Sequence, residues 1–334
     1  MSRFRSFVFL QLPLLTISAL LLSGALAQQS PPPNKPAAPT GSAAKTAPSA
    51  STPLPKPDPN AIAALTKAIE ARESEKLGYV DTNLWEQVDI IGLSFQASGA
   101  YLSGPKDRLR LEIKVRLGNT DSRLLVVSDG KWVWNEVQLA KDKPMVHKYS
   151  LEEVYKNLNV PNVMPTFAEE FYRGQSFRGV EPLLQSLSKQ MTFTKFENAT
   201  WKGKEVYKLT ASWTPDMSKA MAQPGQPWPA FTPRTCYLFL GRDKSNPPYW
   251  PYRLEWWGPA GSASEDKILM QMEFRDPQFF APKVELPKRF AQAFSYNPGK
   301  LEVNDVTEQY VKGIVQARNM PSPQQRPSGG TTPR

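Results

Sequence analysis

The sequence is poor in the residues on which most metal and nucleophile chemistry depends. It has one cysteine, Cys236, and one histidine, His147, among 334 residues. A single cysteine excludes an intramolecular disulfide, and the two residue types are too few for a zinc cluster. Cys236 lies in an apolar, strand-like run, so we expect a small buried side chain. A cysteine nucleophile would need a nearby histidine, and His147 falls beside a predicted turn. We expect no metal and no cofactor.

Complete catalytic motifs are also lacking. Ser186 and Lys189 match the Ser-x-x-Lys acyl-transfer pattern, but no Lys-Thr-Gly follows them. Neighbouring leucines predict an ordinary amphipathic helix with Ser186 and Lys189 on its outside. No glycine-rich phosphate loop is present. The sequence therefore names no catalytic residue, and we expect a protein that is not an enzyme.

After the first residues the chain lacks any apolar run long enough to span a bilayer. Residues 1–27 hold a basic start, an apolar stretch from Phe7 to Leu22, and the small-residue sequence Ala25-Leu26-Ala27. This order is typical of a secretory signal peptide cleaved after Ala27. An uncleaved membrane anchor is the alternative. We expect an exported protein, periplasmic or extracellular.

Bulky apolar residues are scarce in two further segments. Residues 28–59 are rich in Pro, Ala, Ser and Thr, and residues 318–334 in Pro, Ser, Gly and Gln. Such segments bury too little surface to offset chain entropy, so we expect a disordered linker and a disordered tail around one folded domain, 60–317. The formal net charge of +10 could favour an anionic envelope surface. Without a basic helix, and with export expected, it does not indicate nucleic acid.

A strong strand pattern runs from Asp107 to Val137. Apolar residues at 109–117 alternate with charged ones, and Ser128-Asp129-Gly130 marks a turn before the next strand. This predicts an antiparallel meander with one apolar face. We expect one long, bent strand at 84–102 before it. Later strands are expected at 192–197, 205–213, 235–240, 252–257 and 267–275, with an edge segment at 290–303.

Short helices are predicted between the strand groups and at the ends of the domain. We expect one from Asn60, as N-cap, to Leu77, and one beginning at Ser150-Leu-Glu-Glu153, a capping box. Others are expected after Thr166, around Pro182, after Thr214 and after Asp305. Nine tryptophans would crowd a small closed core, so we predict an open, curved sheet with helices laid across its concave face, which leaves a groove.

The groove would be lined by apolar side chains from several strands. The predicted lining residues are Leu93, Phe95, Leu109, Leu111, Ile113, Trp132, Trp134, Leu254, Trp256, Met270 and Met272. The long stretch 217–233 is a candidate lid, with Met217, Met221, Trp228 and Phe231 as the covering residues. Two alternatives stay open: a solid core without a cavity, and lid side chains that only plug the core edge.

These features resemble the periplasmic lipoprotein-carrier superfamily of LolA and LolB. The resemblance spans residues 60–317 and is carried by the first amphipathic helix, the alternating strand at 108–117 and the phrase Val127-Ser-Asp-Gly-Lys-Trp-Val-Trp134. It implies a mainly β (α+β) fold: an incomplete antiparallel β-barrel whose concave apolar face, covered by short helices, binds acyl chains. The chain has no lipobox cysteine, so a membrane-anchored receptor is not expected.

Two functional hypotheses follow. The first is an exported, non-enzymatic binder or carrier of lipid or lipoprotein acyl chains, whose partners would be a lipid or an acylated protein. The second is a structural or interaction module of the cell envelope with a solid core and no ligand. We expect a monomer in either case.

Overall fold

The computed structural model describes residues 56–73, 78–90, 93–117, 120–160, 179–221, 232–245, 247–259, 265–281, 290 and 292–319. The predicted signal peptide, most of the linker, the tail and the helix expected after Thr166 lie outside these residues.

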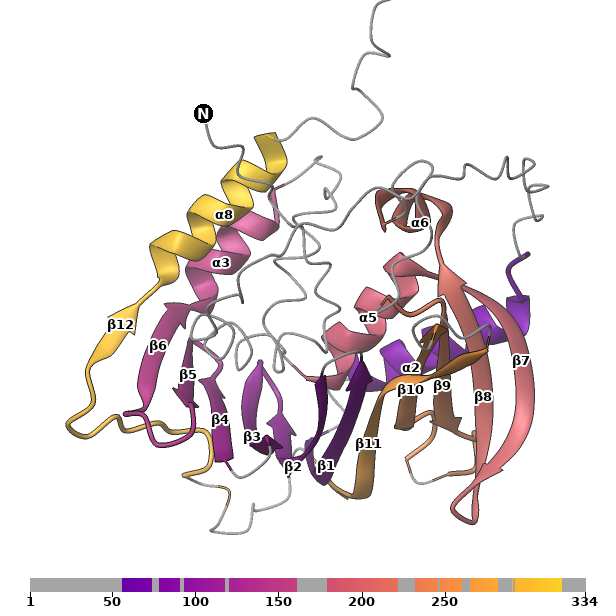
Figure 1. The fold of residues 1–334 in the computed structure, drawn as a ribbon, viewed down its shortest axis with the longest axis horizontal. Helices are drawn as coiled ribbons and strands as arrows, with labels where there is room; N and C mark the ends of the chain where they lie inside the picture. The colour runs from indigo at the N-terminus through magenta and orange to yellow at the C-terminus, as the bar shows by residue number, and fades with distance from the viewer. Residues whose placement is uncertain are drawn as a thin grey trace, which may run out of the picture.

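The described residues form one open, 12-stranded sheet in the order β12-β6-β5-β4-β3-β2-β1-β11-β10-β9-β8-β7. Neighbouring strands are antiparallel except β12 and β6. Figure 1 shows the sheet as a curved wall. The strands are β1 (Tyr79–Ile90), β2 (Leu93–Gly104), β3 (Arg108–Leu117), β4 (Thr120–Asp129), β5 (Trp132–Gln138), β6 (Met145–Ser150), β7 (Met191–Trp201), β8 (Lys204–Trp213), β9 (Thr235–Gly241), β10 (Pro251–Pro259), β11 (Asp266–Phe280) and β12 (Val303–Asp305). The predicted fold class, a mainly β incomplete barrel, is confirmed.

Within the described residues, five helices accompany the sheet. They are α2 (Pro59–Glu73), α3 (Leu151–Leu158), α5 (Val180–Gln190), α6 (Pro215–Met221) and α8 (Thr307–Asn319). Helix α3 packs with α8, which contacts β6, whereas α2 packs with α5 and both contact β7. The two pairs therefore lie at two separate parts of the sheet (Figure 1).

The central meander forms as the alternation predicts. Strands β3, β4 and β5 pair in order, and the turn between the last two is built by Asp129. Its Oδ1 accepts hydrogen bonds from the backbone N–H groups of Lys131 and Trp132, at 2.7 and 2.8 Å. Gly130 has a φ of +92°, and a Cβ there would lie 2.3 Å from the carbonyl oxygen of Lys106. Only glycine fits this turn.

The predicted single strand at 84–102 is wrong. The chain reverses between Ile90 and Leu93, which pair with each other, so the region forms the antiparallel hairpin β1–β2. A glycine within an alternating run is compatible with a bend and equally with a hairpin turn. Strand β6 was also missed, and it places His147 in a strand and not beside a turn.

Helices begin where they are predicted at Ser150, Thr214 and Asp305. The Ser150 hydroxyl accepts from Glu153 N–H at 3.3 Å, Thr214 from Met217 N–H at 3.4 Å, and Asp305 from Thr307 N–H at 3.0 Å. The exception is α2, where Asn60 is not the cap. Asp58 accepts from Asn60 N–H at 2.8 Å and Pro59 opens the helix, a position that suits proline.

Candidate ligand-binding face

Cross-strand pairing defines two faces of the sheet, since directly paired residues point to the same side. We call the side that carries Leu111 the inner face. On β5 this side carries Val133, which pairs with Tyr149 of β6, and Tyr149 stacks on Tyr310 of α8 with ring centres 4.6 Å apart. Helix α5 lies on the same side, because the Tyr101 hydroxyl, paired across from Leu111, accepts a hydrogen bond from Val180 N–H at 3.1 Å.

Apolar side chains cross the inner face in continuous rows. Following the pairs from β2 to β7, one row comprises Phe95, Val88, Met270, Trp256, Cys236, Ala211 and Phe193. The adjacent row, from β3 to β7, comprises Val115, Ala97, Glu86, Met272, Leu254, Leu238, Leu209 and Phe196. Such rows give a broad hydrocarbon-like surface interrupted by one carboxylate.

The structure brings eight of the predicted lining residues together on the inner face. They are Phe95, Leu109, Leu111, Ile113, Leu254, Trp256, Met270 and Met272, and none is more than 6% exposed. Leu93 opens β2, where its backbone pairs with Ile90. The inner face is thus covered in this structure, and a ligand could reach it only if part of the cover moves.

Trp132 and Trp134 do not join this group. Trp134 pairs with Val127, which pairs with Arg110 on the opposite, outer face. There Trp134 stacks on Tyr296, with ring centres 6.1 Å apart, and Trp132 lies 4.6 Å from the Lys148 ammonium. Their placement on the inner face was therefore wrong. An alternation shows that two residues share a face but does not say which face it is.

The predicted lid is described only in part. Met217 lies in α6, which packs on β8, and is 6% exposed. Met221 is the last residue of α6. Trp228 and Phe231 lie outside the described residues, so the lid stays a prediction.

The centre of the inner face lies between the two helix pairs. The main helix contacts on the sheet fall on β6 at one side and on β7 and β8 at the other. Strands β1, β2, β3 and β11 occupy the middle of the strand order. This central stretch, which includes Ile113, Leu84 and Phe274, is the candidate site for an apolar ligand.

Glu86, Thr82 and Tyr101 are polar residues in the central part of the inner face. Glu86 is 2% exposed in the middle of its row. The Thr82 hydroxyl donates to the Arg275 carbonyl at 2.6 Å. Burial raises the pKa of Tyr101, which keeps its phenol neutral and able to accept from α5.

A buried arginine borders this site, and sequence analysis did not find it. Arg72 stands in the last turn of α2 and is 8% exposed. Its guanidinium carbon lies 5.1 Å from the centre of the Trp250 ring, and Nη2 donates to the Pro248 carbonyl at 3.5 Å. A basic residue in a last turn normally complements the helix dipole in solvent, so its sequence position carries no sign of burial.

The residues considered for catalysis are placed as follows. Ser186 is buried, contrary to the prediction that it faces outward, and its Oγ accepts from Gln190 Nε2 at 3.0 Å, whereas Lys189 is exposed as expected. Cys236 is fully buried, as predicted, and burial raises the pKa of its thiol. A protonated, inaccessible thiol is a poor nucleophile.

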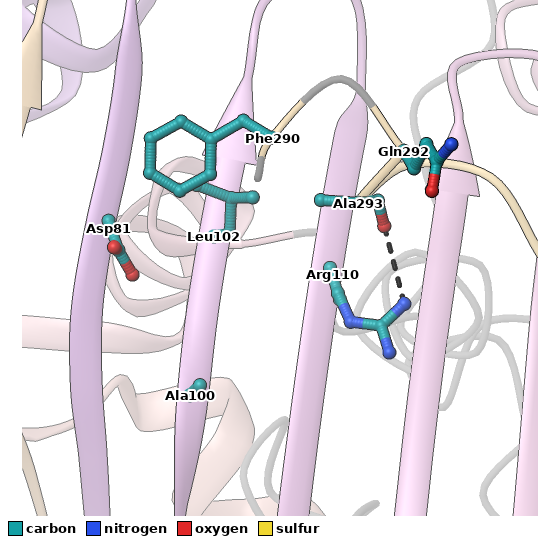
Figure 2. Close-up of a pocket in the computed structure, with 7 residues that line it drawn as sticks. All are labelled: Asp81, Ala100, Leu102, Arg110, Phe290, Gln292 and Ala293. Atoms are coloured by element: carbon teal, nitrogen blue, oxygen red, sulfur yellow. Dashed lines mark hydrogen bonds between the residues drawn. The ribbon is translucent and has the colours of Figure 1, made fainter. Parts of the chain in front are cut away.

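A pocket lies on the outer face, shown in Figure 2. It has a volume of about 370 Å³ and is lined by Asp81, Ala100, Leu102, Arg110, Phe290, Gln292 and Ala293. Phe290, Gln292 and Ala293 lie over β2 and β3 here, and Arg110 donates to the Ala293 carbonyl at 3.4 Å. Its lining combines two charged residues, Asp81 and Arg110, with apolar walls from Leu102, Phe290 and Ala293.

Two further searches cover the described residues only. No group of three or more His, Cys, Asp or Glu side chains within them is arranged to hold a metal ion. None of their helices has both the length and the apolarity to cross a membrane.

No protein-family model and no curated protein matches this chain. Several solved structures are similar to it. The MucA/MucB complex of Pseudomonas aeruginosa is 11% identical, with 70% of this chain and 60% of that chain covered and a TM-score of 0.36. LprF from Mycobacterium bovis is 15% identical, with 70% and 98% covered and a TM-score of 0.36. A LolA superfamily protein from Nitrosomonas europaea is 10% identical, with 69% and 96% covered and a TM-score of 0.25.

The LolA superfamily, to which the sequence was compared above, is thus represented among the similar structures. This chain spans about 60% of the length of the MucB chain it matches. Identities of 10–15% and TM-scores of 0.25–0.36 do not assign a function to this chain.

Proposed function

We propose that this protein is an exported, non-enzymatic binder or carrier of lipid acyl chains. The acyl chain of the ligand would lie on the central part of the inner face. One observation supports this above the others. Apolar rows cross β2, β1, β11 and β10 with Glu86 as their one carboxylate, while the main helix contacts lie to either side of these strands. No catalytic group is needed for such a site.

The expected gain is large enough for binding. Burying an acyl chain is worth about 0.8 kcal/mol per CH₂, so a chain of about 14 carbons would gain on the order of 10 kcal/mol before ordering costs. Opening the cover would consume part of this gain. The alternative is an envelope module with a solid core. It is favoured by the near-complete burial of the inner face, where Leu111 is 0% and Met272 1% exposed.

Native mass spectrometry separates the two functions. The full chain would be purified from its own host and measured with and without a delipidation step. A carrier should retain acyl lipid as a discrete added mass that delipidation removes. A bare mass, together with no uptake of a hydrophobic dye, would support the envelope module and contradict the carrier.

Paired substitutions then test the face itself. Ile113→Asp and Met270→Asp each place a carboxylate on the inner face and should abolish lipid uptake, because a charge is costly beside a hydrocarbon chain. Lys114→Asp and Ser98→Asp place the same group on the exposed outer face and should leave uptake unchanged. Circular dichroism identifies the variants that fold. Uptake by a folded inner-face variant would show that the acyl chain lies elsewhere.

A further inference from the structure

The buried end of α2 contains hydrogen-bond donors that lack an acceptor. Within the described part of the chain, Nε and Nη1 of Arg72 and the indole Nε1 of Trp250 are buried and donate to no acceptor. The one hydrogen bond of the guanidinium, from Nη2 to Pro248, is long at 3.5 Å. Burial lowers the pKa of Arg72 to about 10, so the side chain still carries its positive charge at neutral pH. Buried donors in native proteins are nearly always paired, so an unpaired charged group calls for an explanation.

These donors adjoin the candidate acyl site. The Trp250 ring meets Phe274 edge to face, with centres 5.8 Å apart, and Phe274 meets Tyr101 in the same way at 5.8 Å. Phe274 pairs with Leu84, in the middle of the inner face. A continuous path of aromatic contacts thus leads from Arg72 to the apolar centre.

The chemistry of the cluster selects its ligand. Arginine offers a planar fork of N–H groups that fits the two oxygens of a carboxylate or phosphate, and tryptophan adds a donor but no acceptor. Stacking on Trp250 fixes the guanidinium in place before a ligand arrives. A neutral or cationic head group would leave the charge unpaired.

We propose that Arg72 and Trp250 bind the anionic head group of an amphiphile whose alkyl chain lies on the central inner face. The inference rests on the proposed function, because it requires the alkyl chain of the ligand to occupy the inner face. It adds a class of ligand: an acyl or alkyl chain that ends in carboxylate or phosphate.

The test compares three probes with the same alkyl chain, using the delipidated full chain and calorimetric titration. Myristate and myristyl phosphate carry the anionic group, and myristyl alcohol does not. The wild-type protein should bind one or both anions at least about tenfold more tightly than the alcohol, as expected for charge-assisted hydrogen bonds in a buried site. The tighter anion tells a fatty acid from a phosphorylated lipid, and either result supports the inference.

Variants assign the preference to Arg72. In Arg72→Met the ratio of anion to alcohol affinity should fall to about one while alcohol binding persists, since the chain contacts remain. Arg116→Met removes an arginine whose side chain is 76% exposed and should keep the wild-type ratio. If Arg72→Met does not fold, Arg72→Lys gives the same measurement, because it keeps the charge but loses the fork and should lower the ratio.

The outcomes separate this inference from the proposed function. A wild-type protein that binds all three probes equally, or an Arg72→Met variant that keeps the preference, overturns the head-group assignment and leaves the acyl site standing. A wild-type protein that binds none of the probes overturns the proposed function, and the inference with it.

Discussion

At the scale of single residues, Asp58 connects the first helix to the edge of the sheet. Its Oδ1 accepts from the N–H groups of Asn60 and Ala61 at 2.8 and 3.4 Å, which caps α2. Its Oδ2 accepts from Phe196 N–H at 3.1 Å, and its own N–H donates to the Phe193 carbonyl at 2.9 Å. Strand β7 is irregular between Phe193 and Lys195, so one carboxylate satisfies a helix start and a strand bulge together.

Asp58→Ala should therefore cost more than the loss of an ordinary cap. We expect the free energy of unfolding to fall by about 2–3 kcal/mol, as the sum of a cap and a second charge-assisted hydrogen bond. Ser150→Ala, which removes one 3.3 Å cap bond from α3, should cost about 1 kcal/mol. Urea unfolding of both variants measures the difference. Equal losses would mean that the bond to β7 contributes nothing.

Residues also show where sequence analysis reaches its limit. Period-two alternation correctly grouped Leu109, Leu111 and Ile113, because one charged and one apolar face leave no choice of side. Trp132 and Trp134 alternate with Val133, which is also apolar, so the pattern did not show which of them face inward. The larger size of the tryptophan side chains was a poor guide to this choice. Arg72 was missed because its burial arises from packing on Trp250, far away in sequence.

At the scale of elements, the hairpins depend on close approach of backbones. Gly99 of β2 pairs with Ile113 of β3, and a Cβ at Gly99 would lie 1.7 Å from the Glu112 carbonyl oxygen. Such a contact is with backbone and cannot be relieved by a rotamer change. Strand β2 could accept a larger residue only by moving away from β3.

Gly99→Ala should thus disrupt the centre of the sheet. We expect a loss of about 3 kcal/mol or more, beyond the usual range for overpacking. Gly203→Ala is the matched control, because Gly203 has a φ of +76° but nothing within 4 Å of a built Cβ. It should cost only about 1 kcal/mol of backbone strain. Thermal unfolding and yield of soluble protein report both; a Gly99→Ala protein as stable as the control would refute the close approach.

Elements were predictable where local signals were sufficient. Caps at Ser150 and Thr214 and the turn at Asp129 are local hydrogen bonds, which a sequence displays directly. The β1–β2 hairpin was not predictable in this way, because the pairing of its two strands is not a local signal. The same alternation is expected for two paired strands and for one long strand. Strand β6 is only six residues long and carries apolar residues on both faces, so it has no clear period.

One buried carboxylate ties several elements together on the outer face. Glu273 of β11 is 2% exposed and accepts from Arg253 of β10, from Arg275 at 2.6 Å and from Lys202 at 2.8 Å. Burial alone would raise the pKa of Glu273, but the bonds from Lys202 and Arg275 outweigh it and lower the pKa below its usual value. Its folded pKa thus lies below its unfolded pKa.

This shift predicts a pH dependence. The contribution of Glu273 is complete above its unfolded pKa and is lost as pH falls through the lower folded pKa. Glu273→Gln should reduce the free energy of unfolding by about 2–3 kcal/mol at pH 7, mainly because Arg253, whose side chain is 15% exposed, is left with a weaker partner. It should also flatten the fall in stability between about pH 5 and pH 3. Glu205→Gln, at a pair whose carboxylate is 72% exposed, should change stability by less than about 1 kcal/mol. If stability falls at low pH as steeply in Glu273→Gln as in the wild-type protein, other carboxylates cause that fall.

At the scale of the whole molecule, the curved sheet is held from both sides. Helix pairs α2–α5 and α3–α8 lie on the inner face, and the chain at 292–301 crosses the outer face (Figure 1). There Tyr296 donates to Glu136 at 2.8 Å and stacks on Trp134. The fold class followed from the sequence because alternation and short helices recur along the chain. The course of residues 292–301 across the outer face did not follow from the sequence, because this segment lacks regular structure and the residues it contacts are distant in sequence.

Four tyrosines in different parts of the fold are expected to make its stability fall at high pH. Burial raises the pKa of Tyr101 and Tyr252, and burial with the bond to Glu136 raises that of Tyr296. The hydrogen bond that Tyr207 donates to Asp243 raises its pKa to about 12. Each folded pKa lies above the unfolded value, so the stabilisation is complete below about pH 10 and is lost as pH rises toward the folded values.

We therefore expect the urea midpoint to fall between about pH 10 and pH 12, with each tyrosine contributing at most about 1.4 kcal/mol per pH unit. The double variant Tyr207→Phe with Tyr296→Phe should be less stable than wild type at pH 8, because two hydrogen bonds are lost, but should decline less steeply above pH 10. Tyr237, whose ring packs on Trp257, gives the control Tyr237→Phe, which should keep the wild-type slope. Parallel declines in all three proteins would place the alkaline loss in lysine and arginine titration, and the tyrosine bonds would then not set the limit.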